Sequence, residues 1–288
     1  MSYIFFFSIE RGNIIILAAA FIGFFICYYD SENKYERMLA VISLAFASTL
    51  KVYPVLLGFL YFEKKQYREI FLSTIITLFL VFLPFLFFKR GFSNIPQLIN
   101  NLKLQVIEYD FTRSFPRYSL AHLVFRISNL HSLGFSENLI LSLSKLAQVI
   151  TYITSFVSIL FSCLIKNKWV KISLLTMTVV FLPTNSALYC GLYIFPMIIL
   201  FFATMEERSK IFNVFIFIVL IIFLNPYQIN IKNIITNYIL TNIALLTFWL
   251  VLLIYSGKQI VISNVIFSIK TSFINKLCDI CFGTVKKN

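Results

Sequence analysis

The chain has 288 residues, of which 59% are hydrophobic and 13% charged, and its formal net charge is +13. Soluble domains carry about 25% charged residues, so this composition, with a mean hydropathy of +0.87, excludes an ordinary soluble domain. The basic residues lie in short clusters between apolar runs, which is typical of orientation signals in membrane proteins and argues against a nucleic-acid partner.

Apolar runs recur along the whole chain. Several are shorter than the roughly 20 residues that a full crossing needs, so tilted helices are expected. The predicted fold class is all-α, a polytopic membrane protein with about seven spans plus a broken re-entrant hairpin. The expected helices lie at about 13–29, 70–88, 139–165, 170–183, 187–204, 211–225 and 236–255.

The segment Met38–Phe62 is apolar but has Lys51 and Pro54 near its middle. A lysine at mid-bilayer depth costs about 3 kcal/mol or more, and proline breaks a helix by removing a backbone donor. As one span, the segment would place its basic flanks on opposite faces of the membrane. We therefore favour two half-helices of about 12 residues, each about 18 Å long, over a single span.

This hairpin places the short basic loops on one side, which the positive-inside rule identifies as the cytoplasm. We expect a multi-pass protein of the bacterial inner or plasma membrane, with a loop at about 89–138 outside and the C-terminus in the cytoplasm. The predicted division is a transmembrane domain over 1–257 and a basic tail over 258–288. The basic clusters are Lys34/Arg37, Lys64/Lys65/Arg68, Lys166/Lys168/Lys171 and Arg208/Lys210.

The outer loop begins with a helix signal, since Asn94 can cap a helix and Pro96 suits its first turn. Apolar residues at helical spacing from Ile95 to Val106 predict an amphipathic helix on the membrane surface. The polar residues beyond it suit a sugar phosphate, although a solvated loop whose arginines contact lipid headgroups is an equal alternative. These candidates are Glu108, Asp110, Arg113, Arg117 and His122.

A carboxylate base facing outward would have to come from four acids, because the other carboxylates fall on the cytoplasmic side of this topology. These four are Glu10, Glu108, Asp110 and Glu137.

Three motifs resemble the bacterial membrane mannosyltransferases of glycosyltransferase family 87, within the GT-C superfamily. The first is E-R-G-N-I-I-I-L at 10–17, and the second is L-A-F-A-S-T-L-K-V-Y-P at 44–54, whose K-V-Y-P end is similar to an element of the eukaryotic GPI mannosyltransferases. The third is 182–186 with Tyr189, Tyr193 and Pro196, which departs from the family pattern by lacking a histidine. The resemblance covers about residues 8–205.

The resemblance implies a partial GT-C-like architecture and an inverting transfer of a hexose, commonly mannose, from a polyprenyl-phosphate donor on the extracytoplasmic face. It also implies an aspartate base in an outer loop far upstream of the E-R-G-N element, yet nine residues precede Glu10 here. We therefore expect a chain that lacks an N-terminal part or needs a partner subunit, and that has little transfer activity alone. The catalytic residues stay unassigned.

Lys51 is the candidate for the lipid phosphate, as a point charge, with Tyr53 supplying a hydroxyl or stacking face and Pro54 the helix break. The alternative is that Lys51 snorkels to the outer interface. Glu10, Arg11 and Asn13 are further substrate-binding candidates. Tyr189 and Tyr193 share a helix face and are candidates for lining a cavity, or are ordinary interfacial tyrosines.

Other functions stay open at this point: an enzyme like the O-antigen polymerases or ligases, or a transporter of lipid-linked sugars. The expected partners are membrane lipids and the polyprenyl-phosphate donor. No cofactor and no metal are expected, because a lone C-x-x-C at 278–281 is short of the ligands that a structural zinc needs.

Overall fold

A computed structural model describes residues 13–108, 117–128, 134–183, 186–225, 230–231 and 235–282. Almost all of the described chain is helical, apart from an antiparallel pair of two-residue strands, β1 and β2. The α-helices and strands are α2 Ile15–Tyr28, α3 Lys34–Leu50, α4 Phe59–Glu63, α5 Tyr67–Phe82, α6 Ile95–Glu108, α7 Leu120–Ser128, α8 Glu137–Leu164, α9 Lys168–Phe181, α10 Ile194–Ala203, α11 Lys210–Leu224, β1 Asn230–Ile231, β2 Ile235–Thr236 and α12 Asn237–Phe282. The 3-10 helices are η1 Tyr53–Gly58, η2 Leu83–Leu86, η3 Gly91–Asn94, η5 Leu188–Tyr193 and η6 Met205–Glu207.

The helices are those of a membrane protein. In the part of the chain that the structure describes, three are long and apolar enough to cross a bilayer: Tyr67–Leu86, Glu137–Leu164 and Ile239–Val261. Shorter apolar helices at Ile15–Tyr28, Leu188–Ala203 and Lys210–Leu224 lie beside them. The helical membrane class is thus confirmed, whereas seven spans stay a prediction.

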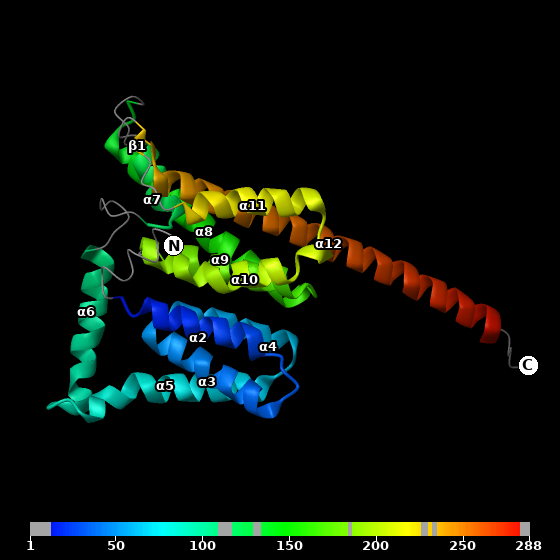
Figure 1. Cartoon of the computed structure of the whole chain (residues 1–288), viewed down its shortest axis with the longest axis horizontal. Coiled ribbons are helices and arrows are strands. Elements are labelled where there is room, and N and C mark those ends of the chain that lie inside the picture. Colours follow the sequence, from blue (N-terminus) through cyan, green and yellow to red (C-terminus); the bar gives the residue numbers. More distant parts are fainter. Residues whose placement is uncertain are drawn as a thin grey trace, which may run out of the picture.

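Most of the helices run along one common direction, and α6 lies across it at one end of the molecule (Figure 1). Helix α9 is at the centre, since every residue from Trp169 to Phe181 is buried, and it packs on α8, α10 and α12. Helix α8 buries a stripe of small residues from Ser144 to Ser162, which lets neighbouring helices approach closely. Trp249 of α12 donates a hydrogen bond to Ser158 Oγ of α8 over 2.8 Å.

The Met38–Phe62 segment does break, but not into two equal α-helices. The Asn33 side chain accepts the Tyr35 N–H over 2.9 Å, and this cap starts α3 at Lys34 rather than at Met38. Its 17 residues rise about 26 Å, so Lys51 lies near the end of the bundle instead of at half its depth. After the break the chain returns as η1 and then α4, and its two basic flanks lie at one end.

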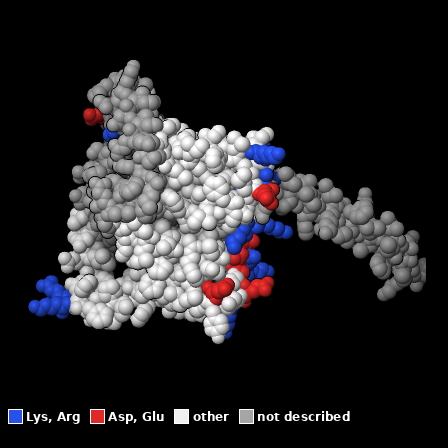
Figure 2. All heavy atoms as spheres, in the orientation of Figure 1, with Lys and Arg blue, Asp and Glu red and all other residues white. Residues whose placement is uncertain are grey.

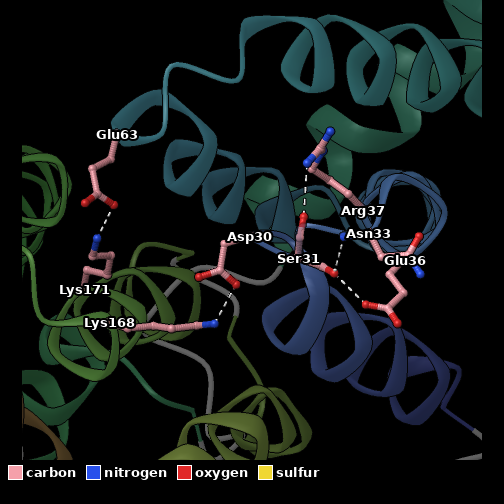
Figure 3. A network of polar contacts seen from close by, with 8 residues as sticks. All are labelled: Asp30, Ser31, Asn33, Glu36, Arg37, Glu63, Lys168 and Lys171. Carbon is pink, nitrogen blue, oxygen red and sulfur yellow. Dashed lines mark hydrogen bonds and ion pairs between the residues drawn. The ribbon is translucent and has the colours of Figure 1, made fainter.

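Most of the charged side chains coloured in Figure 2 gather at that same end. The Lys168 ammonium is 2.7 Å from Asp30, the Lys171 ammonium pairs with Glu63, and Arg37 Nε lies 3.1 Å from Glu69. The Ser31 hydroxyl donates a hydrogen bond to the Glu36 carboxylate, and the Ser31 carbonyl accepts one from the Arg37 guanidinium (Figure 3). The two lysine pairs join the α2–α5 group to α9, and the Arg37–Glu69 pair joins α3 to α5. We call this region, from which all three pairs come, the ion-paired end.

Other boundaries differ from the sequence prediction. The helix expected at 187–204 is η5 followed by α10, and the one expected at 70–88 ends as η2, where Pro84 lies. The loop of 89–138 is largely helical, because it contains η3, α6 and the unexpected α7. Helix α12 continues through the proposed domain boundary at 257 to Phe282, so the helix does not end where the tail was expected to start.

Candidate functional site

Lys51 is the residue at which α3 ends. Its backbone N–H still bonds to Ala47 O over 3.0 Å, but its φ of −149° and ψ of 128° are extended. Pro54, which is buried, then occupies the first turn of η1, as proline prefers. The chain therefore turns at Lys51, between the end of α3 and the proline that starts η1. The lysine side chain is half-buried at this break.

The Lys51 ammonium faces an aromatic ring rather than an acid. Its Nζ lies 5.6 Å from the ring centroid of Tyr189 in η5, within the range of a cation–π contact. None of the salt bridges among the described residues includes Lys51. An uncompensated cation beside a tyrosine, at the end of the bundle opposite the ion-paired end, is suited to binding an anion.

The outer-loop segment at 117–118 is attached next to Tyr189. Arg117 forms an isolated antiparallel bridge with Ala187, and the Tyr118 N–H donates to Ser186 O over 2.8 Å. The Asn242 side-chain amide of α12 donates to Arg117 O over 2.8 Å. The segments at 117–118 and 186–187 and the residue Asn242, which are distant in sequence, therefore meet close to Tyr189, which is two residues after Ala187. We call Lys51, Tyr189 and this bridged segment the Lys51 site.

Arg117 and His122 are not in a solvated loop. Arg117 is 3% exposed and His122 is fully buried. The backbone N–H of His122 donates a hydrogen bond to Ser119 Oγ over 3.4 Å. Burial also raises the pKa of the Tyr118 phenol above its usual range, and the nearby Cys190 adds to this effect, so Tyr118 is neutral at physiological pH. For these residues the structure favours a packed site over a solvated surface.

The remaining candidates are less closely associated with Lys51. Tyr53 is 42% exposed, Tyr193 is buried, and Asn13 uses its side-chain oxygen to accept the Ile15 N–H over 3.1 Å at the start of α2. Glu108 ends α6, and its side chain lies outside the described residues, as do Glu10, Arg11, Asp110 and Arg113.

Sequence reasoning missed Tyr118, Asn242 and Gly191. A Cβ added at Gly191 would lie 3.0 Å from Tyr118 Oη, so this glycine lets η5 approach the tyrosine. Asn242 carried a signal, because it is a polar residue within an apolar run whose amide needs a partner when buried. Tyr118 carried none, since tyrosines are frequent at membrane interfaces.

Together, the fold and the Lys51 site define a helical membrane protein with a half-buried lysine beside a tyrosine at one end. The profile of glycosyltransferase family 87 matches residues 5–183, which is more than half of the chain. The chain therefore belongs to glycosyltransferase family 87, as the motifs at 10–17 and 44–54 indicated. The match includes Lys51 and Arg117 but ends before Tyr189. No curated protein and no solved structure matched the chain.

Proposed function

We propose that this protein binds a polyprenyl-phosphate-linked hexose, mannose in the first instance, and serves its transfer on the extracytoplasmic face of the cell membrane. The observation that carries the proposal is the position of Lys51. It is a cation at a helix break, without a salt-bridge partner among the described residues, and it lies in the segment that the family profile covers.

The chemistry of the donor explains why a lysine suits this place. In the transfer, the bond between the sugar's anomeric carbon and the phosphate oxygen breaks, and the bonding electrons go to the phosphate. The acceptor's hydroxyl oxygen bonds to the carbon and gives up its proton to a base, for which no residue is assigned. Negative charge therefore grows on the phosphate, and a fixed ammonium stabilises it more strongly in a water-poor site than in bulk water. Lys51 would act as this point charge.

The neighbours of Lys51 support the same assignment. The Tyr189 ring lies beside the lysine ammonium, and rings of this kind stack on sugars. The 117–118 segment is bridged to 187, two residues from Tyr189. Because Arg117 belongs to this segment and is buried, it is the second candidate for contact with the sugar phosphate.

Binding of the donor tests this proposal directly. The full chain, purified into lipid nanodiscs, is titrated with a fluorescent short-chain polyprenyl-phosphate mannose, with polyprenyl phosphate as competitor. Lys51→Gln should weaken binding by about ten- to a hundredfold, since a hydrogen bond to a charged group contributes about 1.5–3 kcal/mol. Lys51→Arg, which keeps the charge, should weaken it less.

The matched control is Lys145→Gln, which removes an exposed cation from α8 and should leave donor affinity unchanged. Equal donor affinity for Lys51→Gln and the unsubstituted chain would refute the assignment of Lys51. Tighter binding of a glucose-linked donor would refute mannose while keeping the site.

A further inference from the structure

A second site is suggested by an apolar groove on α5, away from Lys51. The groove has a volume of about 360 Å³ and is lined only by apolar residues of α5, η2 and η3, among them Ile75, Phe79, Phe82, Leu86 and Phe92. Helix α5 packs on α3 and α4, whereas η5, which carries Tyr189, packs on α2, α9 and α10. No residue of the Lys51 site is among those that line the groove.

The groove has the shape and chemistry of a place for a hydrocarbon chain. From Ile75 to Phe82 the helix rises about 10 Å, and the groove follows it toward the end of the bundle. Helix α5 is one of those long enough to cross a bilayer and only 11% of its apolar window is buried, so this face meets lipid. An acyl chain aligned with α5 would fill the groove.

Two cations lie in the turn between η2 and η3, whose residues Leu86 and Phe92 line the groove. These cations, Lys89 and Arg90, are both exposed, and the salt bridges of the described chain include neither. Figure 2 shows a basic group at the corner where α5 meets α6 in Figure 1, away from the ion-paired end. The exposed aromatic rings of Phe87 and Phe88 beside them suit a headgroup boundary.

We propose that this groove binds an anionic phospholipid, with one acyl chain along α5 and the phosphate between Lys89 and Arg90. Charge complementarity favours an anionic headgroup, because a zwitterionic headgroup would place its own cationic group beside Lys89 and Arg90. The size of the groove favours a phospholipid, because an acyl chain extends beyond the groove by much less than the longer polyprenyl chain would.

A tryptophan placed in the groove would report the lipid. Phe82→Trp adds a fluorophore at a groove position, whereas the native Trp169 and Trp249 are buried and provide the background. The full chain is reconstituted in phosphatidylcholine, and phosphatidylglycerol or phosphatidylcholine brominated along its acyl chains is added in equal steps. We expect phosphatidylglycerol to quench the new tryptophan at about one-tenth of the concentration that phosphatidylcholine needs.

The variant Lys89→Gln/Arg90→Gln should abolish this preference, so that both lipids quench equally. The matched control, Lys64→Gln/Arg68→Gln, removes the same two charges at the ion-paired end and should keep it. Circular dichroism and gel filtration check that each variant is folded. Equal quenching by both lipids in the parent chain, or a preference that survives Lys89→Gln/Arg90→Gln, would overturn the proposal. Displacement by polyprenyl phosphate but not by unbrominated phosphatidylglycerol would assign the groove to the donor and overturn the choice of a phospholipid.

Discussion

Gly191 shows how tightly single residues are packed around the Lys51 site. A Cβ at this position would meet Tyr118 Oη at 3.0 Å and Phe223 Cε2 at 3.1 Å. Both neighbours are themselves buried, so neither can move without disturbing others. The glycine is therefore required by close approach, and not by an unusual backbone conformation.

Gly191→Ala should lower the thermal unfolding midpoint, with a loss of about 1–3 kcal/mol from overpacking. Intrinsic tryptophan fluorescence in detergent provides the measurement. The control is Gly257→Ala, where the added Cβ would contact Phe161 at an ordinary 3.7 Å and where alanine favours the helix. If both variants unfold at the same temperature, the Tyr118 contact does not limit this position.

For single residues, the sequence predicted the features that depend on the covalent structure of the residue itself. Pro54 lacks the backbone donor that a continuing helix needs, so the break near Lys51 could be placed from the sequence. The burial of Arg117 could not, because it depends on a bridge to Ala187 and on the amide of Asn242, 125 residues away. No local pattern encodes such a pairing.

Among the elements, the contact of α4 with α9 depends on one ion pair. The Lys171 side chain is 2% exposed, whereas its partner Glu63 is 22% exposed, so the lysine has little water to replace a lost carboxylate. The Asp30–Lys168 pair, which joins the end of α2 to α9, is 23% and 36% exposed. Burial therefore makes the first pair the more sensitive one.

We expect Glu63→Gln to destabilise the protein by about 3 kcal/mol, because it leaves a buried ammonium uncompensated. Asp30→Asn should cost less than about 1 kcal/mol, since its pair is screened by water. Thermal unfolding of both variants in the same detergent compares them. The double variant Glu63→Gln/Lys171→Met should recover much of the loss, and failure to recover it would show that Glu63 acts through another contact.

Element boundaries followed the sequence where a helix signal was recognised. Asn94 and Pro96 predicted a helix start, and α6 begins at Ile95. Helices α8 and α9 begin at Glu137 and Lys168, two residues before the starts expected from the apolar runs. The start of α3 was missed because the Asn33 cap lies in a polar stretch, before the apolar run that marked the helix. That missed turn is the reason that Lys51 lies near the end of the bundle instead of at half its depth.

For the whole molecule, the separation of charge between its two ends predicts an orientation. The ion-paired end carries the basic loops, so the positive-inside rule places it in the cytoplasm and places the Lys51 site outside. The same rule places Lys89 and Arg90 at the outer surface.

Single cysteines in a background without the five native ones test this orientation. Ser93→Cys in η3 should react with a membrane-impermeant maleimide on intact cells, whereas Lys64→Cys should react only after permeabilisation. Both positions are exposed, so burial does not explain a difference. The opposite labelling pattern would invert the topology and move the Lys51 site to the cytoplasmic face.

The Glu63–Lys171 pair also has a consequence for how the protein is made. Glu63 leaves the ribosome 108 residues before Lys171 does, which at about 5–20 residues per second is a delay of about 5–20 s. During that interval α2 to α5 can already be inserted in the membrane. The Glu63 carboxylate, however, does not yet have the Lys171 ammonium of α9 as its counterion. Insertion of the first helices and closure of the bundle are therefore separate events in time. A ribosome stalled between them would display the half-assembled protein to the cell's quality-control machinery.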